Sequence, residues 1–203
     1  PHELPDLDIK DVPFHDSDQY KPGLLRKYRW FWKEHILKNT SYAKETLDII
    51  DGIDISKYLQ PFKGTYKGRR YDCPSPTQRE FTQPKWDADG TAFVDKKISE
   101  MLQMGAVEIC PMRPCIVAPL ILEKGPKKYR IYFDGRYLNL WSVDIPFKLE
   151  TLKYAPQTLH QGDFFSTLDL TSGYYALTVT DASRKYFGFK WKGKYVVYRA
   201  LCF

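Results

Sequence analysis

The stretch Phe164-Phe165-Ser166-Thr167-Leu168-Asp169-Leu170-Thr171-Ser172-Gly173-Tyr174-Tyr175 is the most informative part of this sequence. Its first residues form an apolar run, typical of a buried strand, that delivers one carboxylate, Asp169, and breaks at Ser172-Gly173. A carboxylate at the end of a buried strand is costly unless it is paired, solvated or bound to a cation. Mg²⁺ accepts one or two carboxylates together with substrate phosphates. On these residues alone, Asp169 is either a cation ligand or an aspartate that caps a turn.

The segments around this stretch predict helices first and strands afterwards. Apolar residues recur at helical spacing over residues 23–39, 41–51 and 91–104, and a further short helix is predicted over residues 149–160. Residues 53–87 contain four prolines, and we expect no regular structure there. Strands are predicted over residues 107–110, 116–122, 129–133, 164–170, 174–179, 186–191 and 195–199, the last two joined by a tight Lys192-Gly193 turn. This order predicts an α+β fold.

The net charge of +6 is unevenly distributed along the chain. Residues 1–22, an extended Pro-rich arm, include six acids against Lys10 alone within residues 1–18, a net charge of −5 that leaves +11 for the remainder. A basic body predicts a polyanionic partner, most simply nucleic acid, although a well-solvated surface has the same composition. The clearest basic stretch interleaves cations with tyrosines at Lys67, Arg69 and Arg70. It suits either contact with a nucleic-acid backbone and stacking on bases, or a solvated hairpin loop.

Membrane and metal chemistry are not indicated by the rest of the composition. No apolar run approaches the roughly 20 residues of a spanning helix, and no signal-peptide pattern opens the chain. The four cysteines, Cys73, Cys110, Cys115 and Cys202, lack a zinc-binding spacing. We therefore expect an intracellular protein with reduced thiols and no membrane partner.

Several motifs, in order, resemble those of reverse transcriptases over roughly residues 92–203. Residues 164–175 resemble motif A of that family, and residues 128–139 resemble its fingers motif K-x-R-x-x-x-D-x-R-x-L-N. Residues 105–108 lead to 118–124 as in the family, and residues 184–189 and 198–203 are similar to the strands that precede motif B. The helical region ahead of them, with Trp30, Trp32 and Gly52, is similar to DIRS-type retrotransposons. Gly135, Trp141 and Cys202 depart from the family pattern, and the stretch Pro111-Met-Arg-Pro114-Cys115 replaces a more usual Ser-Pro pattern.

This resemblance implies a division of the chain and roles for its residues. Residues 23–87 form a helical and irregular basic pre-region, 88–160 a fingers-like part, and 161–203 a partial palm with an antiparallel sheet. Asp169 and the Leu170 carbonyl are implied as Mg²⁺ ligands, and Tyr174 as the aromatic gate that excludes a 2′-hydroxyl, although strand tyrosines are often plain core. Arg130 and Lys124 are implied as contacts of the incoming dNTP, and Asp134 and Arg136 as a structural ion pair.

The sequence lacks the Y/F-x-D-D motif that completes the metal site in this family, so we expect a truncated chain that is incomplete for catalysis alone. Three hypotheses follow. The chain is a fragment of a retroelement RNA-directed DNA polymerase that binds RNA or an RNA/DNA hybrid and dNTP. Alternatively it is a domesticated, non-catalytic module that binds RNA or protein in a larger ribonucleoprotein assembly. The third hypothesis is an unrelated α+β interaction protein with accidental motif matches.

Overall fold

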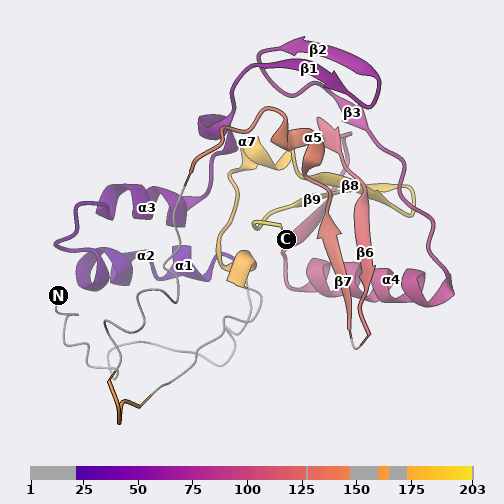
Figure 1. The fold of residues 1–203 in the computed structure, drawn as a ribbon. Helices are drawn as coiled ribbons and strands as arrows, with labels where there is room; N and C mark the ends of the chain where they lie inside the picture. Colours follow the sequence, from indigo (N-terminus) through magenta and orange to yellow (C-terminus); the bar gives the residue numbers. More distant parts are fainter. Residues whose placement is uncertain (1–21, 127, 147–159, 165–172, 203) are drawn as a thin grey trace.

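The computed structural model describes residues 22–126, 128–146, 160–164 and 173–202. Within these ranges the helices gather early in the chain and mixed helices and strands follow, which confirms the α+β class (Figure 1). The acidic arm up to residue 21 lies outside the described residues. So do the predicted helix 149–160, apart from His160, and the predicted strand 164–170, apart from Phe164. The boundaries of the predicted parts stay predictions.

The first two predicted helices form, and the first of them is interrupted. The helical elements here are α1 (Leu24–Lys27), α2 (Arg29–Phe31), a π-helical turn (Trp32–Ile36) and α3 (Ala43–Asp51). α3 ends at Gly52, whose φ of 139° suits glycine. Leu37, Leu47 and Ile50 form a small buried core between these helices. A 3₁₀ turn (Ile55–Tyr58) then leads toward the strands.

A β-hairpin occupies the segment that was expected to be irregular, so that prediction was wrong. β1 (Phe62–Tyr66) and β2 (Arg69–Cys73) pair antiparallel, and the short strand β3 (Arg79–Glu80) follows. Lys67 and Gly68 connect the strands with φ values of 45° and 74°, as the tight turns favoured in hairpins require. Pro61 directly precedes β1 and Pro74 directly follows β2. The prolines therefore delimit the hairpin and remove no hydrogen bond from its ladder.

The centre of the molecule is a mixed five-stranded sheet that packs against the helix α4 (Ala88–Gln103). The strand order is β3-β5-β8-β9-β4, in which the β3–β5 and β5–β8 pairs are parallel and the other two antiparallel. Its remaining strands are β4 (Val107–Cys110), β5 (Ile116–Val117), β8 (Gly188–Trp191) and β9 (Lys194–Tyr198). In α4, Val94, Ile98 and Met101 are buried, as its helical pattern predicted. Lys192-Gly193 joins β8 to β9 with φ values of 46° and 77°, which confirms the predicted tight turn.

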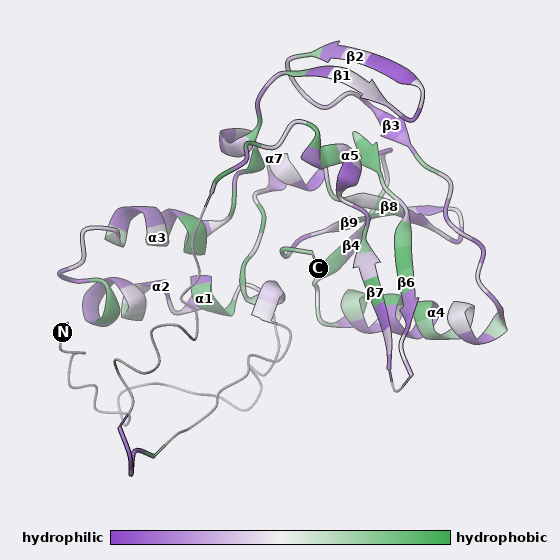
Figure 2. Cartoon of the chain, in the orientation of Figure 1, coloured by the Kyte–Doolittle hydropathy of each residue, from purple (hydrophilic) through white to green (hydrophobic). Residues whose placement is uncertain are grey.

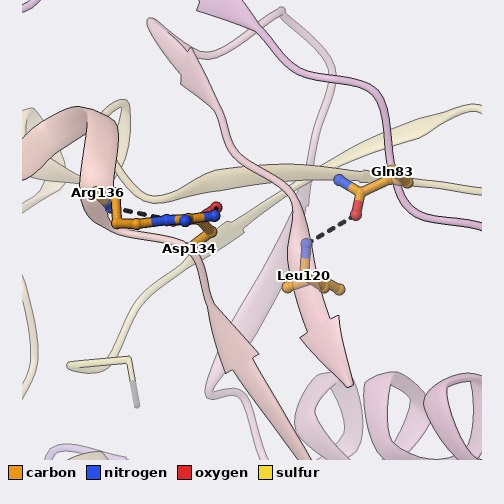
Figure 3. A network of polar contacts seen from close by, with 4 residues as sticks. All are labelled: Gln83, Leu120, Asp134 and Arg136. Carbon is orange, nitrogen blue, oxygen red and sulfur yellow. Dashed lines mark hydrogen bonds and ion pairs between the residues drawn. The ribbon is translucent and has the colours of Figure 1, made fainter. Parts of the chain in front are cut away.

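The strand predicted over residues 116–122 divides at Pro119. Proline has no N–H to continue the ladder, so β5 stays in the central sheet and β6 (Leu120–Lys124) leaves it. β6 pairs antiparallel with β7 (Tyr129–Phe133), whose predicted bounds are confirmed. The Gln83 side chain fixes this divergence by donating to the Ala118 carbonyl and accepting from the Leu120 N–H, each at 2.8 Å. Figure 3 shows the second of these contacts.

An aromatic cluster joins the β1–β2 hairpin to the short helix α5 (Arg136–Asn139). Trp141 is fully buried, with its ring centroid 5.0 Å from that of Tyr137 and 5.3 Å from that of Phe62. Its indole N–H donates to the Cys73 carbonyl at 3.2 Å, at the end of β2. Trp141, a departure from the family pattern, is therefore a core residue that fastens the hairpin to the body.

The strand predicted over residues 174–179 does not form. Residues Gly173–Ala176 instead make a 3₁₀ turn, and α7 (Asp181–Arg184) begins soon afterwards. Among the residues that the structure describes, single bridges join this segment to its neighbours, Thr178 to Ala200 and Val179 to Ile53. An alternating apolar pattern predicts a strand from burial alone, but here the chain runs between two partners without a continuous ladder to either. β8 likewise begins at Gly188, because Tyr186 lies in the turn after α7.

Candidate functional site

A cavity of about 830 Å³ lies between α4, the start of β7 and the 3₁₀ turn Gly173–Ala176. Arg130 and Tyr174, predicted from separate motifs to contact one nucleotide, both line it. The Arg130 side chain is about half exposed, and the carboxylate of Glu123 on β6 lies 3.8 Å away. Tyr174 is 49% exposed, so its ring is accessible from the cavity. Folding thus brings together two predicted site residues from distant parts of the sequence.

The cavity lining combines cationic and apolar residues. Besides Arg130, its lining includes Lys96, Lys97 and Lys128, against a single carboxylate, Glu100. Its apolar lining residues are Phe93, Tyr129, Ile131, Tyr175, Leu177 and Leu201. A lining with both cations and aromatic rings suits a ligand that carries both phosphate and a planar base.

Sequence reasoning missed the contribution of α4 to this cavity. Lys96 and Lys97 were part of a predicted amphipathic helix, and an adjacent lysine pair on such a helix is usually only a solvated face. The available signal was the pair itself, together with Glu100 one turn later. Helical periodicity shows which side of α4 is buried, but it does not show what lies beside the polar side.

One hydrogen bond and one aromatic contact join residues that line the cavity to α4. The Tyr175 hydroxyl donates to the Met101 sulfur at 3.2 Å. Burial raises the pKa of Tyr175 above its ordinary value, so the phenol stays neutral at physiological pH. The Phe93 and Tyr129 rings meet edge to face, with centroids 5.4 Å apart. These contacts fix α4 against the start of β7.

Lys124, predicted beside Arg130, does not line the cavity. Its ammonium group pairs with Asp87, which also caps α4 by accepting from the Gly90 N–H at 2.9 Å. The hydrogen bond between them lowers the pKa of Asp87 and raises the pKa of Lys124, so both groups keep their charges. Its predicted contact with a nucleotide stays a prediction.

Lys67, Arg69 and Arg70 lie on the β1–β2 hairpin, at the opposite end of the molecule from the tip of the β6–β7 hairpin (Figure 1). All three are exposed, and β2 is strongly hydrophilic (Figure 2). The Lys67 ammonium lies 5.0 Å from the Phe81 ring centroid, and the Arg69 guanidinium 5.6 Å from that of Tyr71. The structure therefore contains a second cationic surface, separate from the cavity.

The predicted ion pair between Asp134 and Arg136 is confirmed (Figure 3). Arg136 donates to the Asp134 carboxylate from Nε at 2.8 Å, from Nη2 at 2.7 Å and from its backbone N–H at 3.2 Å, while the Asp134 side chain is almost fully buried. The Arg136 guanidinium holds the pKa of the Asp134 carboxyl below its ordinary value. This pair closes the junction of β7 and α5 and does not line the cavity.

Asp169 and Leu170, the predicted Mg²⁺ ligands, lie outside the described residues. Among the residues that the structure does describe, no group of three or more His, Cys, Asp or Glu side chains is arranged to hold a metal ion. The four cysteines are unpaired thiols, each partly buried. No helix in the described ranges is long and apolar enough to cross a membrane.

Comparison with solved structures identifies the architecture. A foamy viral protease-reverse transcriptase in complex with dsDNA matches 87% of this chain at a TM-score of 0.53 and 19% identity. The fold is reverse-transcriptase-like. The same viral protein in complex with an RNA/DNA hybrid matches 80% of this chain at a TM-score of 0.52 and 18% identity. A third structure, a dRH form with ds DNA, matches 96% at a TM-score of 0.52 and 19% identity.

This reverse-transcriptase-like chain covers 38%, 22% and 35% of those three proteins, respectively. No protein-family model matches its sequence, and no curated protein does either. The likeness therefore extends to the fold alone. It argues against the hypothesis of an unrelated α+β fold, and the DIRS-type assignment stays a prediction.

Proposed function

We propose that this chain is the nucleotide-binding part of an RNA-directed DNA polymerase, with residues 88–160 as its fingers and 161–203 as the first part of its palm. The observation that carries this proposal is that Arg130 and Tyr174 line one cationic cavity. The reverse-transcriptase-like fold supports it. On the pattern of Trp30, Trp32 and Gly52 we assign the polymerase to the DIRS type of retrotransposon.

In this function Arg130 binds the triphosphate of an incoming dNTP. A guanidinium presents several donors in one plane and contacts two phosphate oxygens at once, which an ammonium group does less well. Glu123, at 3.8 Å, is too far away for a short ion pair, so the guanidinium keeps donors for a ligand.

Tyr174 selects the sugar by shape. Its half-exposed ring lies on the 3₁₀ turn Gly173–Ala176, at the end of the segment that resembles motif A. We propose that the ring packs under the deoxyribose and clashes with a 2′-hydroxyl. Discrimination is then steric and needs no hydrogen bond to the sugar.

Asp169, with the Leu170 carbonyl, is proposed to bind Mg²⁺, which would neutralise phosphate charge during nucleotidyl transfer. The donor set fits a hard cation, because both atoms are oxygens. The sequence contains no Y/F-x-D-D motif, so we propose that the remaining carboxylates lie outside these 203 residues. Lys124 is proposed as a further contact of the triphosphate, released from Asp87 when a nucleotide binds.

The test is nucleotide binding by this chain, measured by calorimetry in the presence of Mg²⁺. We expect Arg130→Ala to weaken dATP binding by roughly 10- to 100-fold, the range for a lost charge-assisted contact. Arg113→Ala is the matched control, because Arg113 is similarly exposed, pairs with Glu80 at 3.3 Å and lies outside the cavity lining. Equal affinity of wild type and Arg130→Ala for dATP contradicts the proposal. Tyr174→Val should lessen the preference for dATP over ATP.

The exposed cations of the β1–β2 hairpin favour a second candidate function, a non-catalytic module that binds RNA or an RNA/DNA hybrid within a larger assembly. The foamy viral protein was solved with dsDNA and with an RNA/DNA hybrid, which supports a nucleic-acid partner here. The substitution Asp169→Ala in a longer form of the protein distinguishes the two functions. That change abolishes primer extension if the chain belongs to a polymerase, and it is silent if the chain is only a binding module.

A further inference from the structure

The α4 side of the cavity carries charges that the proposed function leaves unexplained. Lys96 and Lys97 lie one helical turn before Glu100 on α4, and all three line the cavity. Lys128 and Arg130 line it from the start of β7. The two cationic groups therefore belong to two different elements that border one space of about 830 Å³. Like charges that share a cavity repel one another, so the arrangement is favourable only when an anion lies between them.

The lysines of α4 differ in how they are held. Lys97 pairs with Glu100 at 3.0 Å, and both side chains are about one-third exposed. Lys96 is exposed and has no ion-pair partner within the described ranges, and the same holds for Lys128. Glu100 thus compensates Lys97, and Glu123 lies 3.8 Å from Arg130, whereas Lys96 and Lys128 remain available to a ligand.

We propose that α4 is a second phosphate-binding wall, on which Lys96 and Lys97 contact the distal phosphates of a nucleoside triphosphate whose chain is also bound by Arg130. Glu100 holds Lys97 while the cavity is empty and competes with the ligand for it. This proposal rests on the proposed function and specifies its ligand. It predicts an affinity that rises with the number of phosphates, because only a long phosphate chain reaches both walls.

The shape of the site favours a nucleotide over a nucleic-acid strand. The volume lies within the roughly 300–1,000 Å³ of small-molecule sites, and the rings of Phe93, Tyr129 and Tyr175 provide an apolar floor. A strand is usually bound along an extended groove with exposed cations and stacking rings. The β1–β2 hairpin, with Lys67, Arg69 and Arg70 exposed, fits that description better than the cavity does.

The experiment titrates the whole chain with dATP, dADP and dAMP by calorimetry, in Mg²⁺ buffer. We expect the double variant K96M/K97M to weaken dATP binding by roughly 5- to 30-fold, as for two partly exposed charge contacts, and dAMP binding by less than about 2-fold. K96R/K97R should keep most of the dATP affinity, because both charges remain. Glu100→Gln should strengthen dATP binding by roughly 2- to 5-fold, since Lys97 loses its competitor.

Lys192→Met is the matched control, because Lys192 pairs with another α4 carboxylate, Asp95, at 2.7 Å and lies outside the cavity lining. It should leave all three affinities unchanged. If K96M/K97M melts like the wild type and binds dATP equally well, while Arg130→Ala still weakens binding, the second wall is wrong and the proposed function stands. If the wild type binds no dATP, both fail.

Two further outcomes also decide the proposal. If K96M/K97M weakens the binding of a single-stranded 20-mer of deoxythymidine but not that of dATP, α4 binds a nucleic-acid backbone and the proposal is overturned. If the double variant fails to fold, Glu100→Gln decides instead, and an unchanged or lower affinity of that variant for dATP overturns the proposal.

Discussion

The cavity and the β1–β2 hairpin are both cationic, but they are built in opposite ways. The hairpin presents Lys67, Arg69 and Arg70 from one short segment, beside rings of its own neighbourhood such as Tyr71 and Phe81. The cavity collects its cations from α4 and β7 and its rings from three segments. One surface is local to a hairpin, and the other is a cavity that depends on the packing of separate elements. A local surface tolerates a rearranged core, whereas an assembled cavity does not.

The largest effect expected is on the joint between the hairpin and the body. Trp141→Ala should lower the free energy of unfolding by about 3–5 kcal/mol, because it removes a fully buried ring and the bond to the Cys73 carbonyl. Urea unfolding followed by fluorescence measures this loss. Trp30→Ala is the control, because Trp30 is 48% exposed. Equal losses for the two variants contradict the role given to Trp141.

Neutralising the hairpin should separate the two surfaces. The triple variant K67A/R69A/R70A should weaken RNA binding roughly 10-fold at low salt. It should also make the slope of log K against log salt concentration shallower by up to about 2, as for the loss of two or three phosphate contacts. Its affinity for dATP should be unchanged, because the hairpin does not line the cavity. RNA titrations at several salt concentrations measure the first effect. A parallel loss of dATP affinity shows that the two surfaces are one site.

The turn of the hairpin offers a smaller test of its local character. Gly68 has a φ of 74° and open space where a Cβ would lie, so Gly68→Ala introduces backbone strain without a clash. We expect a loss of about 1 kcal/mol in thermal or urea unfolding. Gly135→Ala is the control, because Gly135 has a φ of −77° and a Cβ there makes only ordinary contacts. A loss as large for Gly135→Ala contradicts this account.

The smallest expected effect is on the pH dependence of stability, through Asp134, which feels the charge of Lys67 on the hairpin. The pKa of Asp134 is lowered mainly by Arg136 and also by the charge of Lys67. Because its pKa is lower in the folded state, its contribution to stability is present above the unfolded value of about 3.9 and lost as the pH falls through the folded value. Stability should therefore fall by under about 1 kcal/mol between pH 5 and pH 3 through this group. Asp134→Asn should remove that part of the pH dependence, and an unchanged pH profile contradicts the assignment.

Much of the fold could be read from particular patterns. The apolar period of α4, the bounds of β4 and β7 and the Lys192-Gly193 turn were all predicted, because the pattern that indicates each one lies within a few consecutive residues. The predictions that failed did so because a local pattern does not show which partner a segment pairs with. The prolines of residues 53–87 suggested irregular structure, although Pro61 and Pro74 flank a hairpin whose strands contain no proline. Residues 174–179 alternate like a strand, although they form single bridges with their described neighbours.

By itself, the sequence determined the α+β class, the resemblance to reverse transcriptases, the Asp134–Arg136 pair and the importance of Arg130 and Tyr174 as candidates. Only the tertiary structure decided that Arg130 and Tyr174 share a cavity, that Lys124 faces Asp87, and that α4 adds Lys96 and Lys97. The physical reason is that hydrophobic periodicity specifies which side of an element is buried. Which polar sides face one another depends on how distant elements pack, and local sequence carries little information about that.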